Sequence, residues 1–343
     1  MEKLVNKNES ILDVKNLRVS YHTYAGEVQS VRGVSFEVER GEVLAIVGES
    51  GCGKSVTARS IMALIQAPQG EIKENSKILY NGEDILTYDK KKIREFRGGE
   101  CSMIFQDALT SLNPTMKVGK QIIENLVAHR NMDKKSAREE AIRILDSVGI
   151  PNAEKRVDQY THEFSGGMRQ RVMIAIAVAC NPKILIADEP TTALDVTIQA
   201  QVLDLMTDLK NKFKTSMLLI THDLGVVAQV CDKVAIMYAG EIVEYGSLED
   251  VFENPKHPYT LGLFGSIPSL DEEKTRLVPI KGLMPDPTNL PSGCKFNPRC
   301  PHAVELCSQK IPAITEVTKG HRVQCLIAEG LVKFKENWEE ENE

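Results

Sequence analysis

A glycine-rich run near the N-terminus has the residue types and spacing of a phosphate site. Residues 48–55 read Gly-Glu-Ser-Gly-Cys-Gly-Lys-Ser and match the P-loop pattern, after an apolar run at 44–47 and before a helical segment. Glycines allow a tight turn in which backbone N–H groups and the helix start face phosphate oxygens. We expect Lys54 to reach the β- and γ-phosphates and Ser55 to ligate Mg²⁺. A plain glycine-rich turn is the alternative interpretation.

Two carboxylates stand at the end of a later apolar run. Residues 184–189 read Ile-Leu-Ile-Ala-Asp-Glu, and burial would penalise both charges unless they face a metal or another polar site. Asp188 suits a Mg²⁺ ion held through its water shell, and Glu189 suits a general base that polarises an attacking water. A solvated strand end is the alternative, which the glycine loop upstream disfavours.

Two further features suit the same chemistry. Ser165, Gly166 and Gly167 precede a helical run that starts at Met168, and a helix start presents free N–H groups to an anion. His222 ends another apolar run and would reach a γ-phosphate from there. Taken alone, a Ser-Gly-Gly helix start and a single histidine are more often structural.

The elements that must position these residues predict an α/β chain. Short β-rich runs fill residues 11–47, and helical patterns separate further strands predicted at 77–81, 101–105, 184–188, 217–221 and 234–238. A helical insertion is predicted at about 110–180. Prolines interrupt regular structure after residue 254. We therefore expect a first domain at 1–260 and a small proline- and cysteine-rich domain at 261–343.

Composition narrows the partners and the compartment. The 343 residues carry a net charge of −6, which argues against nucleic acid as the main partner. The N-terminal residues contain no apolar run of signal-peptide length. The longest apolar stretches, such as residues 172–180, are too short to cross a bilayer. We therefore expect a cytoplasmic protein that reaches a membrane only through a partner.

Several motifs together resemble those of one family. Residues 164–171, Phe-Ser-Gly-Gly-Met-Arg-Gln-Arg, closely resemble the signature sequence of ABC-transporter ATPases, with Met168 where the family usually has glutamine. Gln106 resembles the Q-loop residue of that family, residues 193–195 resemble the D-loop, and His222 resembles the switch histidine. The resemblance covers residues 11 to about 250.

The resemblance implies an α/β fold of the P-loop NTPase type, an ABC cassette with a β-rich N-terminal part, which hydrolyses ATP with Mg²⁺. Tyr21 resembles the aromatic A-loop residue, although Tyr24 competes for that assignment. Catalysis is assigned to Glu189 and His222. ATP would be sandwiched between this chain and a second one. The implied nucleotide-binding residues are Tyr21, Gly48, Ser50, Gly51, Gly53, Lys54, Ser55, Val56, Gln106, Ser165, Gly166, Gly167, Asp188 and Asp195, of which Ser55, Gln106 and Asp188 would hold Mg²⁺.

The tail narrows the resemblance further. Residues 257–270 and 279–309 resemble the C-terminal region typical of oligopeptide and dipeptide importer ATPases. The implied function is ATP hydrolysis that powers peptide import. The implied partners are a second ATPase subunit, identical or different, two transmembrane permease subunits and an extracytoplasmic peptide-binding protein. The implied location of this chain is the cytoplasmic face of the membrane. An importer subunit for nickel or another small solute and a soluble ABC ATPase are the alternatives.

Four of the eight cysteines crowd into the tail, and the other four are scattered. Cys294, Cys300, Cys307 and Cys325 lack the tight Cys-x-x-Cys pairs of most structural zinc sites. Cys300 precedes proline, as a cluster ligand does in bacterial ferredoxins. In the peptide-importer family such a set resembles the ligands of a [4Fe–4S] cluster. Zinc or four unligated thiols are the alternatives.

Overall fold

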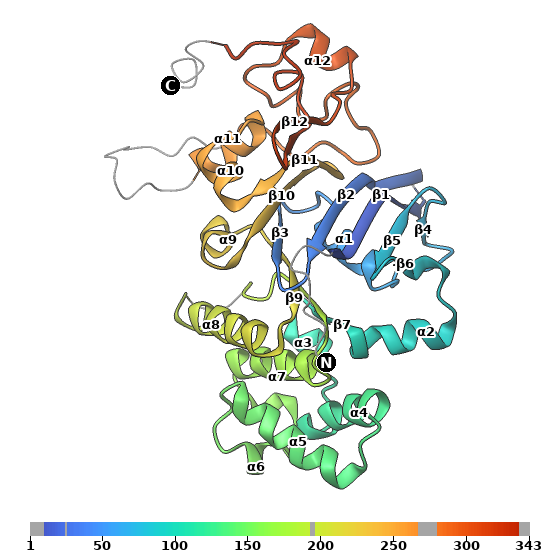
Figure 1. The fold of residues 1–343 in the computed structure, drawn as a ribbon, viewed down its shortest axis with the longest axis vertical. Helices are drawn as coiled ribbons and strands as arrows, with labels where there is room; N and C mark the ends of the chain where they lie inside the picture. Colours follow the sequence, from blue (N-terminus) through green and yellow to red (C-terminus); the bar gives the residue numbers. More distant parts are fainter. Residues whose placement is uncertain (1–9, 25, 193–195, 267–279, 336–343) are drawn as a thin grey trace, which may run out of the picture.

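Two β-sheets form the framework of the protein (Figure 1). The computed structural model describes residues 10–24, 26–192, 196–266 and 280–335. The smaller sheet is antiparallel, has the order β2-β1-β5-β6, and carries β4 beside β1. Its strands are β1 (Ser10–Thr23), β2 (Gly26–Glu39), β4 (Gly70–Ile72), β5 (Lys77–Tyr80) and β6 (Glu83–Asp84).

The larger sheet has the order β12-β13-β11-β10-β3-β9-β8-β7. Neighbours from β10 to β7 run parallel, and β11, β12 and β13 add antiparallel strands at one edge. The α/β expectation is therefore confirmed. The strands are β3 (Val43–Val47), β7 (Cys101–Ile104), β8 (Ile184–Asp188), β9 (Ser216–Thr221), β10 (Lys233–Tyr238), β11 (Glu241–Ser247), β12 (Thr315–Thr318) and β13 (His321–Val323).

The central strand β3 is buried on both faces. Val43, Ala45 and Val47 pack into the core that the helices share, whereas Leu44 and Ile46 pack into the core beneath the smaller sheet. Successive side chains of a strand point to opposite faces, so a strand between two cores reads as a continuous apolar run. β3 therefore holds the glycine loop that follows it on a rigid base.

Helices cover the larger sheet and extend the molecule at one end. In Figure 1, α4, α5 and α6 lie at the end opposite α12. The α-helices are α1 (Lys54–Ile61), α2 (Lys90–Glu95), α3 (Ala108–Ser111), α4 (Val118–Arg130), α5 (Lys134–Ser147), α6 (Ala153–Arg156), α7 (Gly166–Val178), α8 (Val196–Phe213), α9 (Leu224–Val230), α10 (Leu248–Glu253), α11 (Pro258–Gly265) and α12 (Glu305–Gln309). Short helical turns are η1 (Ile85–Thr87), η2 (Phe96–Glu100) and η3 (Thr161–Glu163). The predicted boundary at residue 260 falls inside α11 and stays a prediction.

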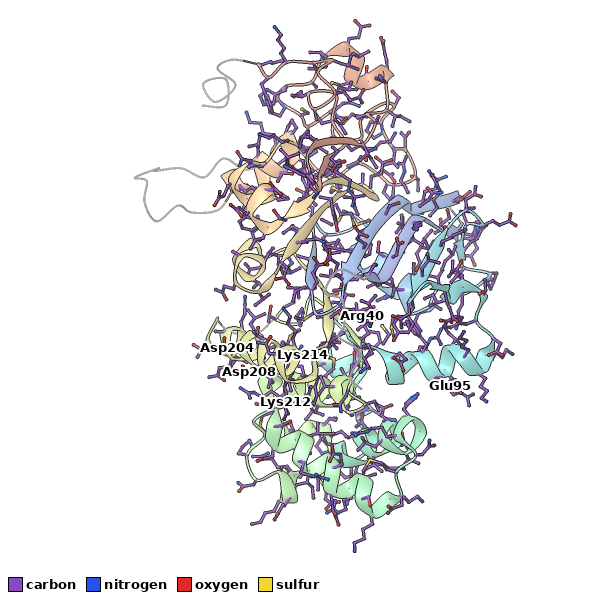
Figure 2. All side chains as sticks on the ribbon, viewed as in Figure 1. Arg40, Glu95, Asp204, Asp208, Lys212 and Lys214 are labelled. Atoms are coloured by element: carbon purple, nitrogen blue, oxygen red, sulfur yellow. The ribbon has the colours of Figure 1, made fainter. Side chains whose placement is uncertain are left out.

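The long helix α8 is amphipathic. Its Asp204, Asp208 and Lys212 are exposed and labelled in Figure 2. Met206 and Leu209 are buried in the core. Charged residues four positions apart share one helix face, so the opposite face meets the protein interior. Among the described helices, none combines the length and apolar composition that a membrane span needs.

Candidate active site

The glycine loop between β3 and α1 is packed against two strands. A Cβ atom on Gly48 would lie 2.1 Å from the carbonyl oxygen of Met237 on β10. Gly53 has φ +108°, and a Cβ atom there would lie 2.4 Å from the carbonyl oxygen of Ser30 on β2. Only glycine tolerates such backbone contact and dihedral angles without strain. The loop backbone is therefore held closely in place.

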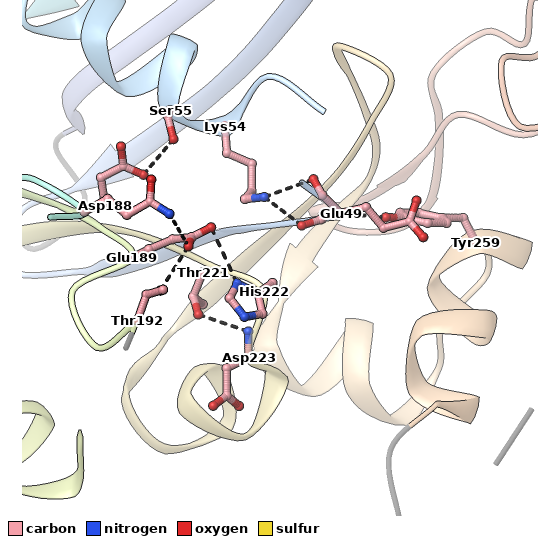
Figure 3. Close-up of polar contacts among 12 residues, drawn as sticks. Glu49, Lys54, Ser55, Asp188, Glu189, Thr192, Thr221, His222, Asp223 and Tyr259 are labelled. Atoms are coloured by element: carbon pink, nitrogen blue, oxygen red, sulfur yellow. Dashed lines mark hydrogen bonds and ion pairs between the residues drawn. The ribbon is translucent and has the colours of Figure 1, made fainter. Parts of the chain in front are cut away.

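Lys54 is buried at the start of α1, directly after this loop, and Figure 3 shows its polar contacts. Its Nζ atom donates hydrogen bonds to the carbonyl oxygens of Gly48, at 2.7 Å, and Glu49, at 3.1 Å. Both partners are neutral, so they satisfy donors without cancelling the positive charge. The ammonium group can therefore serve an anion that reaches the loop.

The glycine loop and the carboxylate pair meet at Ser55 and Asp188. The Ser55 hydroxyl donates to Oδ1 of Asp188 at 2.9 Å. Burial raises the pKa of Asp188, and Ser55 opposes that shift. A buried carboxylate whose charge is disfavoured gains from a nearby cation. The two oxygens thus form a site of the chemistry that Mg²⁺ prefers. Val56 follows in α1 and packs against the core beneath the smaller sheet.

Glu189 is held by several polar groups directly after β8. Its Oε2 atom accepts hydrogen bonds from Gln106 Nε2, at 2.8 Å, and Thr192 Oγ1, at 3.0 Å. His222 Nδ1 lies 3.5 Å from its Oε1 atom. Glu189 has φ +48°, a strained conformation for a glutamate. The contacts with Gln106, Thr192 and His222 fix where the carboxylate points.

The turn that carries His222 is also fixed. The N–H of Asp223 donates to Thr221 Oγ1 at 3.0 Å, and the Asp223 carboxylate caps α9. Its other oxygen accepts a hydrogen bond from Gln199 of α8 at 2.9 Å. Thr192, Thr221 and Asp223 were not expected from the sequence. Thr192 follows Glu189 by three residues, a turn spacing that is a usable signal.

Ser165, Gly166 and Gly167 lie at the start of α7. The Ser165 hydroxyl accepts a hydrogen bond from the N–H of Met168, as an N-cap should. A Cβ atom on Gly166 would meet nothing within 4 Å. The described hydrogen bonds of Ser165 stay within its own helix and do not join it to the glycine loop. This helix start therefore presents an open surface.

Tyr21 lies in β1, where it pairs with Val28 of β2 and Gly70 of β4. A Cβ atom on Gly70 would lie 3.1 Å from the Tyr21 ring, so the ring packs over that backbone. Its competitor Tyr24 is fully exposed. Asp195 and the rest of the expected D-loop, residues 193–195, lie outside the described residues.

The four tail cysteines line one small cavity, together with His257. Burial raises the pKa of Cys294 to about 11 and that of Cys300 to about 12. These thiols therefore keep their protons at neutral pH unless a metal displaces them. In the described part of the chain, no three His, Cys, Asp or Glu side chains are arranged as a formed metal site. The iron–sulfur site expected from the sequence, like its zinc alternative, is thus not shown.

His257 leaves one polar atom of this cavity unsatisfied. Its Nδ1 atom accepts a hydrogen bond from the N–H of Tyr259 at 3.0 Å, and burial lowers its pKa to about 4. The ring is therefore neutral, with its proton on Nε2. That Nε2 atom is buried and has no hydrogen-bond partner among the described residues. A buried donor of this kind calls for an acceptor.

Comparison with protein families identifies two segments. Residues 31–192 match the family described as ABC transporter. Residues 243–307 match the family described as the C-terminal region of oligopeptide/dipeptide transporters. The first match contains the glycine loop, Ser165 and Glu189, and the second contains His257 and three of the tail cysteines.

Curated relatives match nearly the whole chain. The oligopeptide transport ATP-binding protein OppD of Bacillus subtilis (strain 168) is 54% identical, over 92% of this chain and 88% of the relative. The dipeptide transport ATP-binding protein DppD of the same organism is 52% identical, over 92% and 94%. OppD of Escherichia coli (strain K12) is 51% identical, over 92% and 93%.

Solved structures match the fold. The dimeric post-hydrolysis structure of the ATP-binding cassette MJ0796 with ADP and Pi has a TM-score of 0.62 at 24% identity, covering 69% of this chain and 98% of that one. CbiO1 from Clostridium perfringens, part of the complex cbiONQ, has a TM-score of 0.60 at 27% identity, covering 75% and 96%. The expected cassette fold is therefore confirmed.

Proposed function

This chain belongs to the family of ATP-binding subunits of oligopeptide and dipeptide ABC transporters, and from that premise we propose residue roles for its ATPase site. The chain is an ATPase of a peptide importer, as expected from the sequence. Import of nickel or another small solute and a soluble ATPase are not supported. The observation that carries the roles is the Ser55–Asp188 hydrogen bond, which joins the glycine loop to the carboxylate pair.

The glycine loop binds the phosphates of ATP. Backbone N–H groups between Gly48 and Ser55 and the start of α1 face the oxygens, and the Lys54 ammonium exchanges its carbonyl partners for the β- and γ-phosphates. Ser55 and Asp188 would hold Mg²⁺, and the family resemblance adds Gln106 to these ligands. The ion, when bound, neutralises charge on the phosphates. Tyr21 packs against the adenine, because aromatic rings favour stacking.

Glu189 acts on the water that attacks the γ-phosphate. Its carboxylate accepts hydrogen bonds from Gln106 and Thr192, so its lone pairs are directed before water arrives. Orientation of this kind, with proton abstraction, suits a general base. His222, at 3.5 Å, orients the same carboxylate and contacts the γ-phosphate.

A second ATPase subunit completes each site. The open helix start at Ser165, Gly166 and Gly167 binds the γ-phosphate of ATP held by the partner chain, because free N–H groups at a helix start favour an anion. The partner is an identical or a similar subunit. Two transmembrane permease subunits and an extracytoplasmic peptide-binding protein complete the assembly, in which this chain lies at the cytoplasmic face of the membrane. The resemblance adds Asp195, which lies outside the described residues, to the nucleotide-binding residues.

We also propose that the four tail cysteines, Cys294, Cys300, Cys307 and Cys325, would hold a [4Fe–4S] cluster. The proposal is supported by their shared cavity and by the buried Nε2–H of His257, which would donate a hydrogen bond to a sulfur atom there. Four thiolates are the usual ligands of such a cluster. A bound cluster would crosslink this small region and stabilise it where its own apolar core is limited.

Peptide uptake tests the function. The chain is reconstituted in proteoliposomes with its permease, second ATPase and peptide-binding protein, and ATP-dependent uptake of labelled peptides is measured. We expect uptake to stop with Glu189→Gln and to persist with Glu253→Gln, which changes an exposed glutamate. Unchanged uptake with Glu189→Gln would refute the assigned roles.

Metal analysis tests the cluster. The protein is purified anaerobically, its visible absorption is recorded, and iron and sulfide are measured per chain. We expect about four irons per chain, the content of the proposed cluster, and their loss with Cys300→Ser. Zinc, or no metal at all, would refute the cluster and leave the ATPase roles standing.

A further inference from the structure

The C-terminal region reaches the glycine loop through Arg299. Its Nη1 atom lies 2.6 Å from Glu49 Oε2, and its Nη2 atom donates to Glu49 Oε1 at 2.9 Å. The Arg299 side chain is 6% exposed. Its Nε atom donates to the carbonyl oxygen of Lys281 at 3.0 Å, which fixes the guanidinium from the other side. A bidentate pair of this kind is strong and directional.

Tyr259 holds the backbone of Glu49. The N–H of Glu49 donates to the Tyr259 hydroxyl at 3.0 Å, and Tyr259 is fully buried. Its ring packs 4.7 Å from that of Tyr238 and 5.4 Å from that of Phe296, measured between centroids. Both the main chain and the side chain of Glu49 are therefore fixed by residues from α11 and beyond.

These contacts bear on the nucleotide in two ways. The Glu49 carbonyl oxygen accepts a hydrogen bond from Lys54, so the orientation of this peptide unit sets where the ammonium lies before ATP binds. The Glu49 carboxylate would also place a negative charge beside the triphosphate, where repulsion weakens binding. Arg299 neutralises that charge and turns the carboxylate toward the C-terminal region.

We propose that Arg299 and Tyr259 are positioning residues for ATP, so that the C-terminal region sets the nucleotide affinity of the cassette in its own chain. The inference rests on the proposed nucleotide site. A second observation supports it, because residues 284–287 and Leu290 line one cavity with Ser50 and Gly51 of the loop. Arg299 and Tyr259 touch no reacting atom and act through Glu49.

A double-mutant cycle in the full chain tests the inference, with ATP affinity measured by calorimetry in the presence of Mg²⁺. We expect Arg299→Gln to weaken ATP binding about tenfold, because Glu49 is left unpaired. Adding Glu49→Gln should restore most of the affinity, since the repelling charge is then gone. Arg299→Lys should have an intermediate effect, because lysine keeps the charge and loses the bidentate geometry.

Arg322→Gln is the matched control. Arg322 also joins the C-terminal region to the sheet, where its guanidinium lies 4.3 Å from the centroid of the Tyr245 ring, away from the glycine loop. We expect it to leave ATP affinity unchanged. Equal ATP affinities of Arg299→Gln and Arg322→Gln, or no recovery of ATP affinity in the double variant, would overturn this inference. The proposed nucleotide site would still stand. Failure of the unmodified chain to bind ATP would refute the proposed nucleotide site itself.

Discussion

The Nδ1 atom of His222 lies 3.5 Å from the Oε1 atom of Glu189. The two residues follow different strands, β9 and β8, which are parallel neighbours in the larger sheet. Because the carboxyl ends of parallel strands meet at one edge, the sheet brings the imidazole and the carboxylate together. The Glu189 side chain is 12% exposed, and that of His222 is 61% exposed. His222 can therefore move toward a ligand while Glu189 stays fixed.

Replacing the Glu189 carboxylate should separate hydrolysis from binding. We expect Glu189→Gln to lower kcat for ATP hydrolysis about 10³-fold, the contribution of a general base, and to leave ATP affinity nearly unchanged. Phosphate release and calorimetry measure the two quantities. Glu253→Gln is the control, since that glutamate is exposed. A loss of ATP affinity equal to the loss of kcat would contradict this role.

Replacing Lys54 should instead weaken ATP binding. Lys54→Met keeps most of the buried side-chain volume and removes the charge that the γ-phosphate needs. We expect ATP affinity to fall at least tenfold, because an ion pair with phosphate contributes more than about 1.4 kcal/mol. The unfolding temperature should change little. Lys212→Met, in an exposed residue of α8, is the comparison, and equal affinities of the two variants would argue against phosphate contact.

The helix start at Ser165 should be needed for dimer formation between two chains and not for ATP binding by a single chain. We expect the Glu189→Gln protein to form an ATP-dependent dimer, measured by light scattering after size-exclusion chromatography. Adding Ser165→Arg should abolish that dimer and leave ATP binding by the single chain intact, because the new side chain occupies the open surface beside Gly166. Loss of ATP binding by the monomer would instead place Ser165 in its own chain's site.

Glu244 should make the protein sensitive to acid. It is fully buried, lies 2.8 Å from His321 Nε2, and accepts hydrogen bonds from the N–H groups of Lys256 and His257. Burial raises its pKa, but these hydrogen bonds lower it more, so the net pKa is below the usual 4.5. The stability gained from the ionised carboxylate is therefore present above about pH 4.5 and lost as pH falls further.

Thermal unfolding of the unmodified protein and of Glu244→Gln, from pH 7 to pH 3, tests this linkage. At pH 7 we expect the variant to be less stable by about 3 kcal/mol, since one partner of a buried pair is gone. Below pH 4.5 the difference in stability should narrow, because only the unmodified protein has a carboxylate at position 244 that protonation can neutralise. A constant gap over the whole range would contradict the prediction.

Sequence patterns predicted the parallel strands well. The apolar run at 184–188 corresponds to β8 without change, because a strand between two cores needs apolar residues on both faces. The strand expected at 217–221 is one residue longer in the structure, as β9. β13 was not predicted, because its three residues, His-Arg-Val, show no periodicity that a local reading can detect.

The site residues also divide into those that the sequence predicts and those that it does not. Lys54, Ser55 and Asp188, for which we propose phosphate and metal contacts, belong to motifs, and their spacing therefore predicted these roles. Residues that only position others do not. Arg299 and Glu49 are 250 positions apart in the chain, and neither carries a signal for the other. Such a pair arises from tertiary packing of the tail against the loop, which a single sequence does not encode locally.

The outer strands of the larger sheet have a consequence for synthesis on the ribosome. Glu244 and Tyr245 of β11 pair with Val323 and Arg322 of β13, which leave the exit tunnel much later. Until then the nascent cassette carries an open strand edge, with N–H and C=O groups that other chains can pair with. Chaperones that shield such edges would therefore be needed most in the interval before the last strands emerge.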